Sequence, residues 1–226
     1  IIIPLPEKYC TINYFKFCKL LNKQNNAEFI KATAKGVQGK KVITDKGNFE
    51  ADIIVDCTGW QAVLASSLKK NYVNKKMMSF GIETEIPYKK DSKLRFFVDS
   101  DIIENGAAWL FPYGKKARFG VCSYEGKTNI LLNLKKFVGS YNLKIGKIHG
   151  GYFCYCFKKP VVKNIFVAGC ATGQTLPLTG EGIKRSVHFG LKCGEIIQKV
   201  LDNKISIKDA QREYEEFAMK HKKSYQ

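Results

Sequence analysis

The sequence predicts an α/β (α+β) fold in which a second, antiparallel lobe is inserted between two segments of one domain. Residues 53–56 (IIVD) and 164–168 (NIFVA) are short, continuous apolar runs, as expected of strands buried on both faces of a sheet. The segments between them are strand-like and are separated by polar or Gly/Pro turns, which is typical of an antiparallel sheet. Each apolar run ends in a turn that contains glycine. We therefore expect three segments: 1–74, 75–160 and 161–226.

The pattern along the chain predicts the individual elements. The first segment should hold a helix, a strand and then a hairpin, at residues 12–22, 27–34 and 41–50. The inserted lobe should hold four strands, a helix and a last strand, at residues 79–85, 94–99, 107–111, 118–122, 129–138 and 150–157. In the last of these strands, Cys154 and Cys156 would share one face, for which we favour core packing over redox work.

Two helices are expected after the second apolar run. Residues 181–201 carry one apolar stripe at helical spacing, which comprises Ile183, Val187, Leu191, Gly194, Ile197 and Leu201. Gly190 and Gly194 lie four residues apart, and we interpret them as a close backbone contact with a sheet. Ser206 should cap a last helix that runs to about residue 219.

The chain is strongly basic. Its 226 residues include 38 Lys and Arg against 20 Asp and Glu, a formal net charge of +18. Such a charge favours nucleic acid, an anionic membrane surface, or only a solvated basic exterior. The lysines come as scattered pairs and no nucleic-acid recognition motif is present, so we expect no nucleic-acid binding.

Cysteine usage and hydropathy indicate where in the cell the protein is expected. The eight cysteines form no C-x-x-C, and none stands at a metal-ligand spacing from one of the three histidines, so we expect reduced thiols and no metal site. No apolar run approaches the roughly 18 residues that span a bilayer. These features predict a cytoplasmic protein that contacts a membrane at most peripherally.

The turn with the sequence GCATGQTLPLTGEGI, from Gly169 to Ile183, carries the clearest chemistry. Glycines let a backbone approach a ligand closely because they lack a side chain. Gly180 and Gly182 stand where a long helix begins, and the unpaired N–H groups of a helix start favour negative charge. The turn therefore indicates a site for a ligand with a negatively charged edge; a glycine-rich turn that binds nothing is the alternative.

Three segments, in order, resemble one family. VAGCATGQTLPLTGEGI is similar to the GDA-G…P-x-x-GEGI block of the geranylgeranyl reductases, which belong to the p-hydroxybenzoate hydroxylase-like flavoproteins. ADIIVDCTG, at residues 51–59, resembles the strand and ATG turn that lie close to FAD in these proteins. WLFP, at residues 109–112, with Phe119-Gly120-Val121 resembles the substrate-lobe segment of the reductases. The resemblance, which is closest to the digeranylgeranylglycerophospholipid reductases, covers most of residues 27–201.

The resemblance implies a function and a set of site residues. A family member transfers a hydride from reduced FAD to isoprenoid double bonds of a lipid precursor, inside an apolar pocket. The cofactor-binding residues would be Thr58, Gly59, Gly169, Cys170, Ala171, Pro177, Gly180, Glu181, Gly182 and Ile183. The substrate pocket would include Phe80, Trp109, Phe111 and Pro112. We assign no catalytic side chain and interpret His188 as a packing or solvent-exposed residue.

Departures from the family pattern leave alternatives open. Cys170 stands where the family has an acidic residue that hydrogen-bonds FAD, and Ala107 stands where it often has Tyr. The strand–GxGxxG–helix unit that binds the ADP half of FAD is missing, so we expect that half to be absent or to be a separate polypeptide. Two other hypotheses are a different flavin oxidoreductase or monooxygenase of the superfamily, and a non-catalytic remnant or partner subunit.

Overall fold

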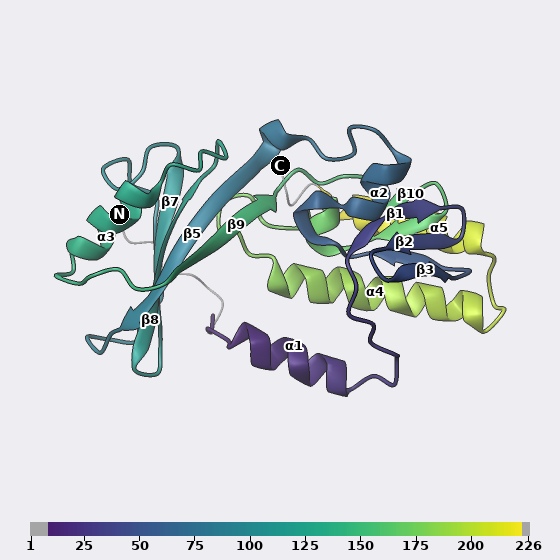
Figure 1. Cartoon of the computed structure of the whole chain (residues 1–226), viewed down its shortest axis with the longest axis horizontal. Helices are drawn as coiled ribbons and strands as arrows, with labels where there is room; N and C mark the ends of the chain where they lie inside the picture. Colours follow the sequence, from purple (N-terminus) through teal and green to yellow (C-terminus); the bar gives the residue numbers. More distant parts are fainter. Residues whose placement is uncertain (1–8, 223–226) are drawn as a thin grey trace. The chain divides into compact units, whose positions relative to one another are not determined.

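The computed structural model describes residues 9–222 of the chain (Figure 1). The chain forms two compact units. The first unit comprises the segment up to Lys31 together with Gly81–Ser123 and Thr128–Gly150. The second comprises Ala32–Phe80, Tyr124–Lys127 and the segment from Gly151 onward. The chain thus crosses between the units more than once, as expected of an inserted lobe.

The two apolar runs form neighbouring parallel strands in the second unit. They are β4 (Ile54–Asp56) and β11 (Ile165–Val167), and Val55 of β4 lies opposite Phe166 of β11. The short strand β10 (Val161–Val162) pairs antiparallel with β11 on the other side, which gives the order β10-β11-β4. In the described part of the chain β4 is therefore an edge strand.

A three-stranded meander precedes this sheet. It consists of β1 (Ala34–Gln38), β2 (Lys41–Thr44) and β3 (Gly47–Glu50), and the predicted hairpin is confirmed as β2–β3. The predicted strand over 27–34 is wrong, because the strand begins where that segment ends. Val37 of β1 is buried with the core residues of the short helix α2 (Val63–Leu68), whereas Phe29 is 76% exposed. Burial against α2 therefore decides which residues of this segment form β1 and pair with β2.

Two long helices end the second unit, α4 (Ile183–Leu201) and α5 (Ile207–Lys220), close to the predicted bounds. Asp209 N–H donates to the Ser206 hydroxyl, so the predicted cap is confirmed. The buried cores around these helices include Phe166 and Tyr214, together with the α4 residues Phe189, Cys193 and Ile196.

Most of the apolar stripe that predicted α4 lies off its buried face, although Ile197 packs against the core. Of the predicted stripe, Ile183 is 41% exposed and Leu191 is 65% exposed, and Val187 and Leu201 are exposed as well. The predicted close contact at Gly190 and Gly194 is also absent, since a Cβ at either position would meet nothing within 4 Å in the described chain. The helix turns Phe189, Cys193 and Ile196 inward because α5 and β11 offer aromatic and aliphatic partners there.

The first unit is built on an antiparallel sheet with the order β6-β7-β8-β5-β9. Its strands are β5 (Met78–Pro87), β6 (Arg95–Phe97), β7 (Gly106–Tyr113), β8 (Lys116–Ser123) and β9 (Ile148–Cys154), and β5 and β9 each continue into the second unit. Helix α3 (Leu131–Gly139) packs Phe137 against Phe119 of β8. Helix α1 (Tyr14–Lys23), near its predicted position, buries no residue. The α/β fold with an antiparallel lobe is confirmed.

Candidate functional site

The turn that follows β4 is organised by a buried carboxylate. Asp56, the last residue of the strand, is fully buried. One of its oxygens accepts hydrogen bonds from the Thr58 N–H at 2.9 Å and the Thr58 hydroxyl at 2.6 Å, and the other accepts from the Ala65 N–H at 2.8 Å. The Thr58 hydroxyl oxygen in turn accepts from the Val63 N–H at 2.6 Å. Asp56 thereby caps α2 and fixes Thr58 and Gly59, where a one-turn 3₁₀ helix, η1 (Gly59–Gln61), begins.

The turn that follows β11 is organised by a neutral amide. It opens with a second 3₁₀ helix, η3 (Gly169–Thr172), and the buried Gln174 side-chain oxygen accepts the Gly169 N–H at 2.7 Å. The Gly169 carbonyl accepts from the Gln174 N–H at 3.2 Å and from the Thr172 hydroxyl at 3.0 Å. The Gly169 amide is therefore already used within the protein. Gln174 was missed by the sequence reasoning, because its role depends on a bond that no motif records.

The remaining predicted cofactor residues lie around the start of α4. The Gly180 N–H donates to the Leu176 carbonyl at 3.0 Å, and the Leu176 N–H donates to the Glu181 carbonyl at 3.1 Å, which closes the loop around Pro177. Gly180 has φ of +66°, a conformation that favours glycine. Helix α4 then starts at Ile183 with Gly182 as its N-cap, with no side-chain cap and no acidic residue in its first turn.

This helix start fits a ligand with negative charge. A helix leaves its first N–H groups without intrahelical partners, and its dipole places partial positive charge there. The α4 start has 19 helical residues behind it and no acidic side chain of its own turn to neutralise that charge. Cys170 is half-buried and Ala171 is buried in η3, which contacts α4. The start of α4 therefore offers backbone N–H groups and partial positive charge to an anionic group, whereas the Gly169 amide does not.

Aromatic side chains gather beside the β4 turn. The Tyr152 ring lies 5.1 Å from the Trp60 ring and 4.9 Å from the Phe80 ring, and all three are half-buried. A Cβ at Gly180 would lie 3.7 Å from the Phe153 ring, so this ring borders the α4 loop. Sequence reasoning selected Phe80 and missed the others. Trp60 could have been found from its position in the sequence, because it directly follows the predicted cofactor residue Gly59.

The other predicted pocket residues belong to the first unit. The Trp109 indole lies across Gly120 of the neighbouring strand, where any Cβ would collide with it, and its N–H donates to a Glu83 oxygen at 3.0 Å. Phe111 stacks beside Trp109, with ring centroids 6.4 Å apart. Pro112 is buried on the opposite side of the strand. Trp109 and Phe111 thus form a half-buried face that includes a carboxylate.

No other cluster in the described chain offers an obvious catalytic centre. Among residues 9–222 there is no group of three His, Cys, Asp or Glu side chains that could hold a metal ion. His188 is exposed and contacts the rings of Phe217 and His221, each with centroids 5.4 Å away, which agrees with a packing role. No helix within the described residues has the length and apolar character needed to cross a membrane.

Solved structures show which proteins share this fold. No protein-family model matches the chain. A geranylgeranyl bacteriochlorophyll reductase-like protein from Thermoplasma acidophilum has a TM-score of 0.77 at 17% identity, over 91% of this chain and 58% of its own. A flavin-dependent halogenase from a Brevundimonas species has a TM-score of 0.67 at 13% identity, over 92% of this chain and 44% of its own. The fold is that of the FAD-dependent oxidoreductases.

Sequence relatives narrow this class. Digeranylgeranylglycerophospholipid reductase 3 from Methanosphaera stadtmanae is 26% identical over 147 residues, which are 61% of this chain and 37% of the relative. Reductase 1 from the same organism is 25% identical over 178 residues, 74% of this chain and 44% of the relative. The chain is thus similar to the digeranylgeranylglycerophospholipid reductases, as its motifs predicted. It spans less than half the length of these curated relatives.

Proposed function

We propose that the chain is part of an FAD-dependent reductase that saturates isoprenoid double bonds of a lipid precursor. The observation that supports this most directly is the pair of backbone turns after β4 and β11, together with the uncapped start of α4. The similarity to digeranylgeranylglycerophospholipid reductases supplies the substrate class. A bound flavin would supply the hydride, and a side-chain triad or a metal is not required.

The protein's own residues would bind and orient the cofactor. The N–H groups at the start of α4 would face the negatively charged edge of the ring, while Thr58 and Gly59 would border it with their backbone. Trp60, Phe80, Tyr152 and Phe153 offer apolar surface for the ring or the prenyl chain. Within the antiparallel lobe, Trp109 and Phe111 offer a separate aromatic face that suits a prenyl chain. Apolar walls serve this chemistry because they exclude water from the reacting carbon atoms.

Absorbance tests this assignment. The purified chain is scanned for a flavin band, alone and with a candidate dinucleotide-binding partner and excess FAD. We expect a band with the partner and, after reduction, conversion of a prenylated glycerophospholipid to products heavier by two hydrogen atoms per double bond, as measured by mass spectrometry. A flavin band that never forms under any of these conditions contradicts the assignment.

We also propose that a separate strand–GxGxxG–helix unit completes the FAD site. Two exposed features of the second unit support this proposal. The β4 strand has a free edge in the described chain and its Val55 is 38% exposed, whereas parallel strands are normally covered on both faces. Helix α4 exposes the stripe of Ile183, Val187 and Leu191, with open space over Gly190. The curated relatives extend well beyond the part that this chain matches, and that additional polypeptide could cover both features.

Paired substitutions test this docking surface. The double variant V187D/L191D should prevent co-purification with a GxGxxG-containing partner and should abolish the flavin band. The matched control is L131D/L132D, which likewise introduces two acidic residues, at the exposed leucines of α3 in the first unit. Equal recovery of the complex from both variants would exclude this α4 face as the docking surface.

Two alternatives remain as outcomes of these experiments. Oxygen consumption with a hydroxylatable substrate would assign the chain to the monooxygenases, one of which, a probable FAD-dependent monooxygenase from Pseudomonas aeruginosa, shares the fold at a TM-score of 0.62. A non-catalytic partner subunit is favoured by Cys170 and by the internal use of the Gly169 amide. The absence of flavin with every partner would support that alternative.

Finally, we propose that the basic surface lets the enzyme contact an anionic membrane that carries its substrate. The net charge of +18 is the support for this step. Vesicle sedimentation measures it: binding should be stronger to anionic than to neutral vesicles and should weaken as salt rises. Equal binding to both kinds of vesicle would contradict it.

A further inference from the structure

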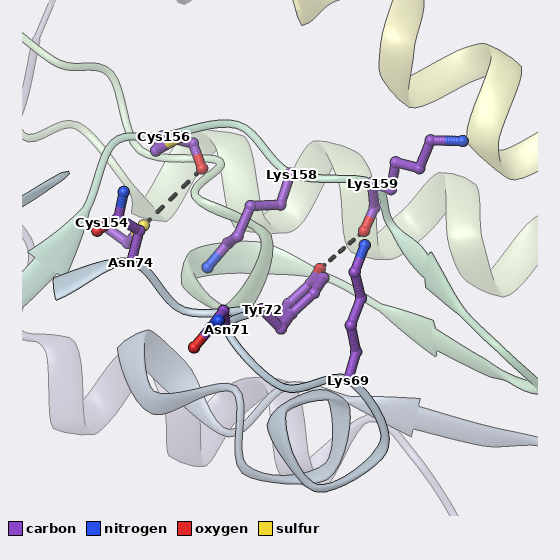
Figure 2. Close-up of a pocket in the computed structure, with 8 residues that line it drawn as sticks. All are labelled: Lys69, Asn71, Tyr72, Asn74, Cys154, Cys156, Lys158 and Lys159. Atoms are coloured by element: carbon purple, nitrogen blue, oxygen red, sulfur yellow. Dashed lines mark hydrogen bonds between the residues drawn. The ribbon is translucent and has the colours of Figure 1, made fainter. Parts of the chain in front are cut away.

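A lysine-lined pocket lies within the second unit, between the segment that follows α2 and the segment that follows β9 (Figure 2). Its volume is about 260 Å³, less than the roughly 300–1,000 Å³ of sites that enclose a drug-sized ligand, so it suits a small group. The lining residues are Lys69, Asn71, Tyr72, Asn74, Cys154, Cys156, Lys158 and Lys159. They include no aspartate and no glutamate.

The central feature of the pocket is the ammonium group of Lys158. Its Nζ is buried and has no hydrogen-bond partner among the described residues. It lies 4.9 Å from the centroid of the Tyr72 ring, which offers a cation–π contact but accepts no hydrogen bond. Burial of a charge is costly unless an opposite charge or acceptors compensate it. Lys158 is therefore a buried cation that an anion in the pocket would stabilise.

Two hydrogen bonds fix the backbone that carries Lys158 and the Tyr72 ring that its side chain contacts. Its backbone N–H donates to the Thr172 carbonyl at 2.8 Å, which ties it to η3. The Tyr72 hydroxyl donates to the Lys159 carbonyl at 2.7 Å, so the ring that Lys158 contacts is fixed to the same segment. In Figure 2 the Lys158 side chain runs into the pocket toward Asn71, while the Lys159 ammonium points away from it. Lys159 forms an ion pair with Glu215 at 2.7 Å.

Further donors and charge surround this ammonium. The Asn74 side-chain oxygen accepts the Lys76 N–H at 3.1 Å, which leaves its amide NH₂ as a donor. Asn71 adds a second side-chain amide, and Lys69 lies on the other side of the Tyr72 ring in Figure 2. An adjoining hollow shares Asn71 and Asn74 and adds two more lysines, Lys75 and Lys76, again with no carboxylate.

We propose that this pocket binds a phosphate group, with Lys158 as its principal ligand and Asn71 and Asn74 as hydrogen-bond donors. Lysine is a compact point charge that suits phosphate, and flanking lysines attract anions over longer distances. The phosphate belongs to a phospholipid head group or to a free phosphorylated metabolite. The first source rests on the proposed function, since it is the head group of the glycerophospholipid substrate; the second does not.

Phosphate binding is tested on the full chain without flavin, so that failure of this proposal is separable from failure of the reductase assignment. The binding of inorganic phosphate and of glycerol 3-phosphate is measured by calorimetry and by the rise of Tm with ligand concentration. K158M should weaken binding at least tenfold, and K158R should retain part of it. The control K46A removes the same charge from an exposed turn and should bind as the wild type does.

Thermal unfolding without ligand gives an independent readout. If the Lys158 ammonium is uncompensated, K158M should match or exceed the wild-type Tm in phosphate-free buffer, and only the wild type should gain stability when phosphate is added. A lower Tm for K158M together with unchanged phosphate binding would show that Lys158 serves packing against Tyr72 and would overturn the proposal.

Vesicles identify the source of the phosphate. The probe is phosphatidylglycerol in phosphatidylcholine, compared between K158M and K46A, which carry equal net charge. A loss of vesicle binding confined to K158M assigns the pocket to a lipid head group. Equal vesicle binding by the two variants, with glycerol 3-phosphate binding lost only in K158M, assigns it to a free metabolite. If neither probe distinguishes K158M from K46A, the pocket is not a phosphate site.

Discussion

The two turns that follow the parallel strands β4 and β11 are held by different chemistry. The β4 turn is anchored by the buried Asp56 carboxylate, which accepts three hydrogen bonds. The β11 turn is anchored by the Gln174 carboxamide, which accepts one hydrogen bond from Gly169. Hydrogen bonds to a charged acceptor are about twice as strong as neutral ones. The first turn is therefore mainly a structural anchor, whereas the second carries little charge of its own beside the proposed flavin.

The largest expected effect is that of D56A. This substitution leaves buried donors at Thr58 and Ala65 without their acceptor, and it removes the cap of α2. We expect the free energy of unfolding to fall by about 2–6 kcal/mol, because each of the two backbone N–H donors left unsatisfied costs about 1–3 kcal/mol. Urea denaturation measures this loss. A loss below that of Q174A would contradict the contrast between the two turns.

Q174A should have the next largest effect. It removes one neutral hydrogen bond to the Gly169 N–H and leaves that buried donor unsatisfied, which costs about 1–3 kcal/mol. The same denaturation series provides the value. Q174E keeps the shape of the side chain but buries a charge, and its effect on stability should exceed that of Q174A. The opposite order would mean that the β11 turn tolerates charge.

C170D tests the missing charge of the β11 turn. The carboxylate would restore a charge-assisted hydrogen bond to the flavin worth about 1.5–3 kcal/mol, so FAD affinity in the partnered complex should rise by roughly 10- to 100-fold. C170S, which adds a neutral hydroxyl, is the matched control and should gain much less. Fluorescence titration with FAD gives both dissociation constants. Equal affinity in both variants would place Cys170 outside the flavin site.

The smallest expected effect is the pH dependence of stability that Cys193 contributes. It tests the buried core beside α4 rather than the two turns. Burial raises the pKa of the Cys193 thiol in α4 from about 9 to about 12. Because the folded state holds this proton more tightly, its contribution to stability is complete below pH 9 and is lost as pH rises from about 9 to about 12. The alkaline loss should be smaller in C193A than in the wild type and unchanged in Q174A. An unchanged loss in C193A would assign it to other groups.

Local patterns were sufficient for much of the fold. The apolar runs that became β4 and β11 and the hairpin β2–β3 are encoded within a few neighbouring residues. The end of α4 and the start of α5 were predictable, because Asp202-Asn203 ends the first helix and the Ser206 cap begins the second.

Features that depend on distant partners were not predictable. Helix α4 carries two apolar stripes, and packing against Phe166 and α5 rather than periodicity decides that Phe189 and Cys193 face inward. The glycine turn predicts a flavin region, which stays a prediction, but the use of the Gly169 amide by Gln174 and the fixation of Tyr72 by the Lys159 carbonyl arise only in the folded chain. Local elements were thus easier to predict than the long-range contacts that hold them in place.

Gly173 has a consequence for how such turns change during evolution. It has φ of +72°, and any Cβ there would collide with the Cys156 carbonyl, so the fold requires glycine whether or not a flavin binds. Gly182 is less restricted, since a Cβ would lie 3.2 Å from the Thr175 hydroxyl, which can shift slightly. A lineage that loses its cofactor should therefore retain Gly173 while Gly182 drifts to alanine or serine. The pattern of surviving glycines in related genes would then record which copies still carry a flavin.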